Sequence, residues 1–232
     1  MSLLDLPTGS RRYLQIARQL AGEIQNGRYA SGERLPPERE LAQTLDVSRT
    51  TVREALLALE IMRFIEIKVG AGVYVLDASA RARGDLAEPD SAAPSEVLAA
   101  RRLVEAETAA LAASSATPAQ LEAMHEANER MAANIDNIAR FDAADALFHQ
   151  RVAEAAGNDV LSGFVSQLWR MRESKMWAFW YDQTRHPGNR RQSVEDHRVI
   201  LRAFERRSPD AARTAMQSHL DVLANRFYEL KL

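Results

Sequence analysis

The sequence predicts a mainly α-helical protein, with an N-terminal winged helix-turn-helix and a C-terminal all-helical antiparallel bundle. Two observations predict the first part. Apolar residues recur at helical spacing over 41–59 around a sharp turn, and two alternating strands follow on either side of a glycine turn. The third observation concerns the rest of the chain: from Ser95 onward it is rich in Ala, Leu, Glu and Arg in long helical periods, with no strand pattern.

The composition favours a two-domain protein whose overall charge does not attract nucleic acid. The 232 residues suffice for one small and one larger core, and the net charge is −2. Residues 1–77 hold ten Lys and Arg against ten Asp and Glu, so DNA affinity would depend on local placement of charge and on two copies. The chain has no cysteine, no transmembrane-length apolar run and no signal-peptide core. We therefore expect a cytoplasmic protein without a membrane partner.

The N-terminal domain is predicted to span residues 1–77. Its first helix runs over Arg11–Asn26, where apolar residues share one face, and Gly27 ends it. Pro36-Pro37 introduces a second, short helix. Asp46-Val47-Ser48 forms the sharp turn before the third helix.

The third helix begins at a Ser48 cap and carries candidate DNA contacts. Forked donors and hydroxyls in the first turn of such a helix meet base edges and phosphates, and the positive end of the helix dipole adds to this. The candidates are Ser48, Arg49, Thr50, Thr51 and Arg53, with Arg34 and Arg39 completing a cluster of arginines. The alternative is that these arginines merely solvate the surface, and Arg34 could pair with Glu33 or Glu38.

Strands at 64–68 and 73–76 flank Val69-Gly70-Ala71-Gly72 and predict a wing, because Gly70 and Gly72 let a hairpin approach a phosphate backbone. GERLPPEREL, VSRTTVREAL and this G-x-G hairpin together resemble the winged-helix domain of the GntR family of bacterial transcription regulators. The resemblance implies a homodimer that binds an inverted repeat in double-stranded DNA. Val69 departs from the family pattern, in which a basic residue often precedes the glycine, and this leaves Lys68 as the nearest cation.

Residues 78–94 are small, charged and proline-containing, which predicts an exposed linker before a second domain over 95–232. Short connections between its helices predict an antiparallel bundle. The predicted helices are Glu96–Ala113, Ala119–Ala133, Ile138–Ala156, Val160–Tyr181, Arg190–Arg207 and Asp210–Leu230. The fourth carries five large apolar residues that we assign to the core or a dimer contact rather than to ligand stacking, namely Phe164, Leu168, Trp169, Trp177 and Trp180.

Four residues of this domain have the chemistry of a metal site. Asp145 and His149 are four residues apart and share a helix face, while His197 and His219 fall on the last two helices. Neutral imidazoles with one carboxylate hold divalent ions and leave coordination positions open. Spacing by itself leaves a second interpretation, in which these are hydrogen-bonded core or surface histidines.

The segments around these residues resemble the all-helical (FCD) sensor domain of the FadR subfamily of GntR regulators, in its metal-binding form. The resemblance implies that Asp145, His149, His197 and His219 bind a divalent transition metal, Zn first and Ni, Co, Mn or Fe as alternatives, with Asp142 as a rival carboxylate. Such family members sense small organic acids. Arg101 matches the arginine of the first sensor helix, although it could instead form a salt bridge to Glu105.

A further similarity, in Leu168-Trp169 with Arg172, indicates the branch that regulates hexuronate use and makes Arg172 a second acid-binding candidate; we assign Lys175 to the surface. The sequence therefore predicts a DNA-binding repressor that a small acid releases from its operator, and not an enzyme. Two alternatives stay open. One is a regulator that responds to the metal itself, and the other is a metal-dependent lyase or hydrolase with Asp142 or Glu195 as general base.

Overall fold

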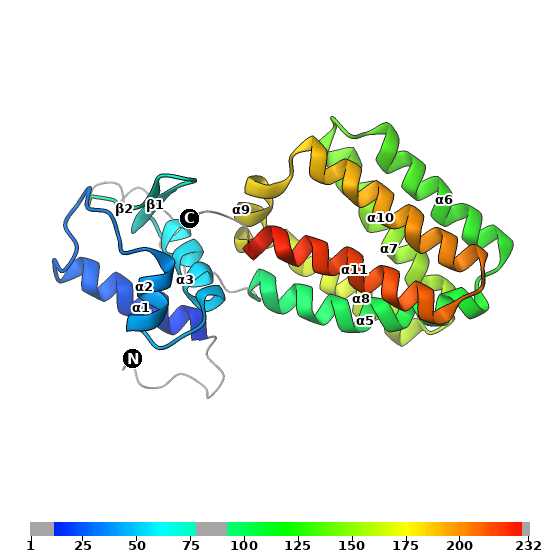
Figure 1. Cartoon of the computed structure of the whole chain (residues 1–232), viewed down its shortest axis with the longest axis horizontal. Helices are drawn as coiled ribbons and strands as arrows, with labels where there is room; N and C mark the ends of the chain where they lie inside the picture. Colours follow the sequence, from blue (N-terminus) through cyan, green and yellow to red (C-terminus); the bar gives the residue numbers. More distant parts are fainter. Residues whose placement is uncertain (1–11, 78–91, 229–232) are drawn as a thin grey trace. The chain divides into compact units, whose positions relative to one another are not determined.

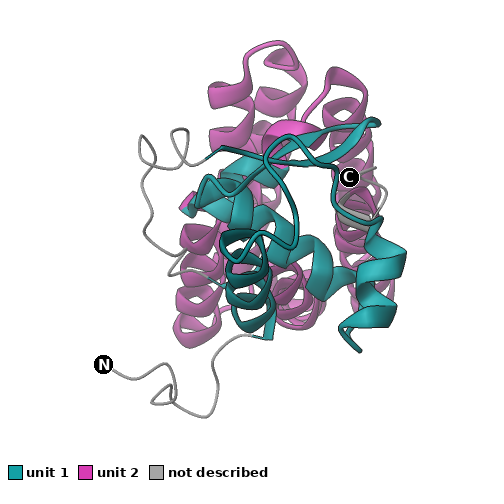
Figure 2. Ribbon diagram, turned by 90° about the vertical axis from the view of Figure 1, so that its left-hand side faces the viewer, with its two compact units in different colours: residues 1–93, 174–180, 229–232 teal, residues 94–173, 181–228 magenta. Residues whose placement is uncertain are grey.

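A computed structural model describes residues 12–77 and 92–228, which form two compact units (Figures 1 and 2). Within the described part, the first unit contains residues 12–77, 92–93 and 174–180, and the second contains 94–173 and 181–228. Most of the predicted linker lies outside the described residues. None of the helices in the described ranges is long and apolar enough to cross a membrane.

Helix α1 (Arg12–Gln25) buries the face predicted from its apolar spacing, from Tyr13 to Ile24. The helix ends as expected at Gly27. This glycine adopts a φ of 78°, in the left-handed region that other residues avoid, and donates its N–H to the Ile24 carbonyl at 3.1 Å.

Helices α2 (Glu38–Thr44) and α3 (Arg49–Ile61) form the predicted helix-turn-helix. The turn between them includes Asp46, whose φ is 50°. Ser48 caps α3, because its Oγ accepts a hydrogen bond from the backbone N–H of Thr51 at 3.0 Å. The central turns of α3 are buried against α1 and α2, so the helix is held by its middle while its first turn stays at the surface.

The wing is a two-stranded antiparallel hairpin, as predicted. Strand β1 (Ile65–Lys68) pairs with β2 (Gly72–Val75) in a register that sets Ile65 opposite Val75 and Lys68 opposite Gly72. Gly70 at the turn has a φ of 78°, which favours glycine.

Gly72 has a second reason to be glycine. Its φ is 119°, and a Cβ at this position would lie 2.3 Å from Nε of Arg34. The backbone of Arg34 also forms an isolated antiparallel β-bridge with Tyr74 of β2. The Arg34 side chain therefore packs directly over the Gly72 backbone, in space that any other residue would fill.

The second unit is an antiparallel helical bundle with α5 beside α11 (Figure 1). Helix α10 packs against α11 and α6, α7 packs against α6 and α5, and α8 covers α5 and α7. The helices of this half of the chain are α5 (Pro94–Ser115), α6 (Pro118–Ala133), α7 (Ile138–Ala155), α8 (Asp159–Arg170), α9 (Lys175–Thr184), α10 (Pro187–Glu205) and α11 (Pro209–Tyr228).

The fourth predicted helix, Val160–Tyr181, is wrong as a single element. The chain leaves α8 at Arg170, passes through a 3₁₀ turn at Met171–Glu173, and starts α9 after Ser174. The Ser174 hydroxyl accepts a hydrogen bond from the N–H of Trp177 at 3.2 Å, which provides a new helix start. Periodicity continues across such a break because the flanking residues remain helical, so the pattern does not reveal it.

Candidate metal centre and DNA-binding surface

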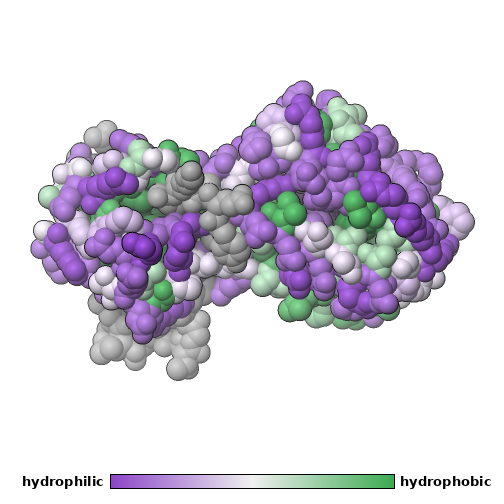
Figure 3. Space-filling model, viewed as in Figure 1, coloured by the Kyte–Doolittle hydropathy of each residue, from purple (hydrophilic) through white to green (hydrophobic). Residues whose placement is uncertain are grey.

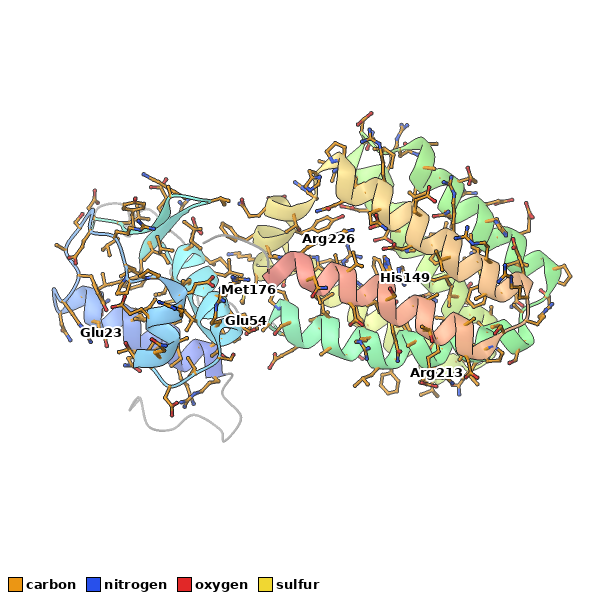
Figure 4. All side chains as sticks on the ribbon, in the orientation of Figure 1. Glu23, Glu54, His149, Met176, Arg213 and Arg226 are labelled. Atoms are coloured by element: carbon orange, nitrogen blue, oxygen red, sulfur yellow. The ribbon has the colours of Figure 1, made fainter. Side chains whose placement is uncertain are left out.

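The bundle brings together the four residues predicted to bind a metal. Asp145 and His149 lie on α7, His197 on α10 and His219 on α11. One nitrogen from each histidine lies within 4.8 Å of the others. The Oδ1 atom of Asp145 is 3.6 Å from Nε2 of both His149 and His197. Figure 4 shows His149 in the interior of the bundle.

Three atoms of this cluster converge without a hydrogen-bond partner among the residues that the structure describes. They are Nε2 of His149, Nε2 of His197 and Oδ1 of Asp145. The two histidine side chains are 1% and 0% exposed. Burying an unsatisfied polar group costs about 1–3 kcal/mol, so three at one point require an explanation. A divalent cation would satisfy all three, and three imidazoles with one carboxylate suit a transition metal.

Carboxylates behind the histidines orient their rings. Asp196 lies 3.2 Å from Nδ1 of His219 through its Oδ2 atom, and Oε2 of Glu105 contacts Nδ1 of His149. His197 is held differently, because the ring of Phe148 stacks on it with centroids 3.9 Å apart. Histidines that bind metals commonly donate the second ring N–H to a carboxylate in this way, which directs the other nitrogen to the ion.

Burial keeps His149 and His197 neutral. It lowers the pKa of His149, although the carboxylate of Glu105 opposes that shift. Burial also lowers the pKa of His197 well below its usual value, and the positive charge of Arg101 lowers it further. For Glu105 burial raises the pKa, but the charge of Arg101 and the hydrogen bonds from His149 and Arg101 outweigh it and hold the carboxyl ionised. Neutral imidazole is the form that binds a metal.

A cavity of about 20 Å³ adjoins the cluster, with Asp145 and His219 in its wall. Five arginines also line it: Arg101, Arg172, Arg185, Arg190 and Arg226. So many guanidinium groups around one space favour an anionic ligand. The volume suffices for a water molecule or an ion. A sugar acid would enter only if side chains in the wall moved.

Arg101 and Arg172, the two predicted acid-binding residues, both line this cavity and stack on the same indole. Their guanidinium carbons lie 4.3 Å and 4.0 Å from the ring centroid of Trp169. Arg101 also forms the salt bridge to Glu105 that was its alternative role, with Nε donating to Oε1 at 2.5 Å. Its Nη1 has no hydrogen-bond partner among the described residues.

The five large apolar residues that we assign to the core or a dimer contact differ in burial and in their contacts. Trp177 and Trp180 are 2% and 0% exposed, whereas Phe164 is 52% exposed and Trp169 supports two arginines of the cavity. Ligand stacking by Trp169 was the less favoured interpretation. Its ring packs against Arg101 and Arg172, which line the cavity.

Asp142, the rival carboxylate, is already bonded, since its Oδ1 accepts the Tyr181 hydroxyl at 2.7 Å. Sequence reasoning missed this tyrosine and three cavity arginines. Helical spacing could have found two of them. Arg190 lies seven residues before His197 on α10, and Arg226 lies seven residues after His219 on α11, so each shares a face with a histidine of the cluster.

The first turn of α3 presents several of the predicted DNA contacts to solvent. The Arg49 side chain is 65% exposed, with one Nη2 contact to Glu38 at 3.5 Å. Arg39 and Ser48 are exposed, and Thr50 is half-buried. Ser48 and Thr51 also hydrogen-bond to each other through their hydroxyls at 2.8 Å. Arg34 is exposed and forms no salt bridge with Glu33 or Glu38 among the described residues; its side chain packs on Gly72 instead.

For Arg53 the prediction of a DNA contact needs correction. The residue is 4% exposed, and both Nε and Nη2 donate to Glu38 at 2.7 Å. A bidentate pair in a buried setting leaves the guanidinium no free edge for a base. Arg53 therefore joins α3 to α2 in this structure.

Comparisons with known proteins agree with this architecture. Residues 12–75 match the model of the "Bacterial regulatory proteins, gntR family", and residues 96–222 match the "FCD domain". The "Uxu operon transcriptional regulator" of Escherichia coli K12 is 36% identical over 230 residues, covering 96% of this chain and 89% of that protein. The "Uxu operon regulator" of Haemophilus influenzae is 34% identical, covering 95% and 84%.

A third relative, the "Exu regulon transcriptional regulator" of E. coli K12, is 32% identical and covers 94% of this chain and 85% of its own. Among solved structures, E. coli McbR/YncC has the same fold with a TM-score of 0.52 at 20% identity, covering 94% and 97% of the two chains. All three relatives are named as regulators, and none as an enzyme.

Proposed function

This chain belongs to the GntR family of bacterial regulatory proteins and carries an FCD domain, and from that premise we propose a homodimeric repressor controlled by a small organic acid at a metal site. The observation that carries the proposal is the convergence of Asp145, His149, His197 and His219 beside an arginine-lined cavity. DNA binding and transcription regulation follow from the family itself. The chain is thus a regulator and not a lyase or hydrolase.

The metal that we propose is zinc, with Ni, Co, Mn and Fe as alternatives that the same ligand set accepts. Support comes from the three converging atoms that have no hydrogen-bond partner within residues 12–77 and 92–228, and from the carboxylates that orient His149 and His219. When bound, the ion supplies open coordination positions for an acid's carboxylate and its adjacent hydroxyl or carbonyl. The residues of the chain supply the cationic wall.

The acid that we propose is a hexuronate or a related sugar acid. The Uxu and Exu names of the relatives and the resemblance to the hexuronate branch support this class. Arg101 and Arg172 would bind its carboxylate, because guanidinium N–H groups form charge-assisted hydrogen bonds with carboxylates. The small cavity means that binding must displace side chains of the wall.

The N-terminal domain, which we assign to residues 1–77, would bind one half of an inverted repeat, with residues 78–94 as linker and 95–232 as the sensor and dimerisation domain. Arg49, Arg39 and the exposed hydroxyls of the α3 first turn would face the DNA. Gly70 and Gly72 form the hairpin that would approach the groove. We expect the protein to act in the cytoplasm, where the bacterial chromosome lies.

We propose α8 as the centre of the dimer contact. Val160 and Phe164 lie one turn apart and are 66% and 52% exposed, and Leu103 on the neighbouring α5 is 68% exposed. Figure 3 shows hydrophobic residues along the edge where Figure 1 draws α5 and α8. Helix α8 starts with Asp159 and ends with Arg170. Two antiparallel copies would therefore bring each Asp159 toward the partner's Arg170 around an apolar centre.

A thermal-shift screen tests the function. The purified protein is loaded with zinc and melted with glucuronate, galacturonate and their keto forms, and a chelated sample serves as control. Binding to the native state raises the melting temperature by mass action. At a ligand concentration 100 times the Kd, it raises the free energy of unfolding by about 2.7 kcal/mol. A shift with one acid that disappears on chelation supports the proposal. If no acid shifts the zinc-loaded protein, the assignment of an acid effector fails.

The small size of the cavity favours one second candidate, a regulator that senses the metal itself. A volume of about 20 Å³ holds an ion without rearrangement. In that case zinc addition or chelation would by itself change operator affinity, and the acids would have no effect. Titrating operator binding against zinc without any acid separates the two functions.

A further inference from the structure

Glu105 lies on α5 between the two halves of the proposed site. It is 2% exposed, so both carboxylate oxygens are away from water. Oε1 accepts a hydrogen bond from Nε of Arg101 at 2.5 Å, and Oε2 contacts Nδ1 of His149. Nη2 of Arg101 also reaches Oε2, at 3.5 Å. One buried carboxylate thus touches a cavity arginine and a histidine of the metal cluster.

We propose that Glu105 is the positioning residue that couples metal binding to acid binding. The proposal rests on the acid-and-metal function given above and adds the physical link between its two ligands. Glu105 touches neither ligand itself. It acts through His149 on one side and through Arg101 on the other.

The contact with His149 sets the tautomer of the imidazole ring. When Nδ1–H donates to Glu105, the lone pair of the neutral ring is on Nε2, the atom that faces Asp145 and His197. A histidine that binds a metal through one nitrogen is a stronger donor through the other. An occupied site should therefore hold Glu105 more firmly than an empty one.

The contact with Arg101 fixes the orientation of the guanidinium group. Glu105 holds the Nε edge, and the Trp169 ring supports the plane at 4.3 Å. This leaves Nη1, which has no hydrogen-bond partner among the described residues although Arg101 is 1% exposed and lines the cavity. A donor held in place and unsatisfied is prepared for an acceptor, and an acid in the cavity supplies one.

The two contacts share one rigid group, so whatever fixes one of them fixes the other. Metal binding should raise acid affinity, and by thermodynamic linkage acid binding should raise metal affinity by the same factor. Another contact between cluster and cavity, from Arg172 Nη1 to Asp145 Oδ2 at 3.4 Å, is longer than the Arg101–Glu105 contact and less buried. We therefore assign the larger part of the coupling to Glu105.

The test measures zinc affinity by competition with a chelator, with and without saturating glucuronate or galacturonate. In the wild type we expect the acid to tighten zinc binding roughly 5- to 150-fold, the usual range of allosteric coupling. In Glu105→Gln we expect zinc binding to weaken roughly 10- to 100-fold, as for other lost outer partners of metal ligands. In this variant the ratio of zinc affinities with and without the acid should fall toward one.

Two further variants exclude a general loss of structure. Glu107→Gln is the matched control, because Glu107 lies on the same helix but at the surface, paired with Arg213. It should behave as wild type. Glu105→Asp keeps the charge on a shorter side chain and should give an intermediate coupling factor. Far-ultraviolet circular dichroism verifies that each variant retains the helical fold.

The outcomes are distinct. If the acid tightens zinc binding more than fivefold in the wild type and equally in Glu105→Gln, the role of Glu105 is overturned and the acid-and-metal function is left intact. A wild-type factor of one with every hexuronate overturns the coupling together with the acid effector, while zinc affinity still reports on the metal site.

Discussion

At the scale of single residues, Arg49 and Arg53 show how burial divides two like side chains. They lie one turn apart on α3 and both contact Glu38. The Arg49 side chain is 65% exposed and its contact is 3.5 Å, whereas the Arg53 side chain is 5% exposed and paired at 2.7 Å. An exposed arginine keeps its donors for a phosphate or a base, and a buried bidentate one holds two helices together.

Substituting each arginine separates these roles. Arg49→Ala should abolish operator binding without changing stability or metal content. Arg53→Ala should destabilise the winged domain by about 3–5 kcal/mol, because it leaves Glu38 buried without its main partner. Operator binding by electrophoretic mobility shift and urea denaturation measure the two effects. Specific operator binding retained by Arg49→Ala would contradict its role.

His197→Ala tests the metal cluster. It removes a buried nitrogen that faces Asp145 at 3.6 Å, so zinc affinity should fall by more than the roughly 10- to 100-fold that an outer partner costs. The zinc-dependent rise in melting temperature should also disappear. His125→Ala is the matched control, because His125 is half-buried, lies outside the cluster and pairs with Glu205 at 3.1 Å. The zinc content of both variants is measured after dialysis. Equal zinc in the two variants would argue against the site.

Glu60, at the end of α3, makes the stability of the winged domain depend on pH. Its Oε1 accepts the N–H of Ile67 at 3.0 Å, and burial raises its pKa from 4.5 to about 7, with the charge of Glu66 adding to the effect. The folded state therefore binds more protons than the unfolded state between these pH values, and stability should fall as pH rises from 4.5 through 7.

Glu60→Gln should remove this decline. At pH 8 we expect the variant to be more stable by about 1–2 kcal/mol, less than the full pKa difference implies because Glu60 is only partly buried. At pH 4.5 the two proteins should be nearly equal. Urea denaturation at both pH values measures the change, with Glu40→Gln on the exposed side of α2 as control. A uniform difference at both pH values would exclude titration of Glu60.

At the scale of elements, the break between α8 and α9 matters most for the site. The 3₁₀ turn at Met171–Glu173 contains Arg172, which contacts Asp145 at 3.4 Å and stacks on Trp169. A straight helix through this turn would continue the α8 direction instead. Trp169 at the end of α8 and Arg172 in this turn lie against each other, and Arg172 lines the cavity.

Helix α8 also carries the proposed dimer contact, which Phe164→Glu tests. A charge in the centre of an apolar two-fold contact meets its own copy, so the variant should be monomeric at concentrations where the wild type is dimeric. Size-exclusion chromatography with light scattering measures the mass. Leu111→Glu, at a 47% exposed position on α5, is the control for a charge elsewhere on the apolar surface. A dimeric Phe164→Glu protein would move the contact away from α8.

At the scale of the whole molecule, the proposed function joins three binding events, to DNA, acid and metal. A repressor released by an acid must bind that acid more tightly when free than when bound to its operator. The linkage is thermodynamic and does not depend on how the two units are arranged.

Reciprocity gives the corresponding prediction. If the acid lowers operator affinity by a factor between roughly 5 and 150, saturating operator DNA must lower acid affinity by the same factor. Isothermal calorimetry of the acid against the zinc-loaded protein, with operator duplex or with a scrambled duplex, measures it. Equal acid affinities in the two samples would mean that the acid is not the signal for DNA release.

Local elements followed from the sequence because their causes are local. The Ser48 cap, the Gly27 stop and the wing hairpin rest on contacts between residues close in the chain, and the structure has each of them. The set of metal-binding candidates could be named because helical spacing aligned Asp145 with His149 and the family resemblance added His197 and His219. The break after Arg170 could not, since a 3₁₀ turn hardly disturbs the apolar period.

By itself, the sequence determined a winged helix-turn-helix followed by an all-helical domain, and it named the histidines that this domain brings together. Only the tertiary structure decided which atoms meet. It buried Arg53 against Glu38, set Arg34 over Gly72, and put Glu105 between Arg101 and His149. The physical reason is that periodicity specifies the face of a helix on which a side chain lies, whereas its partners depend on how distant helices pack.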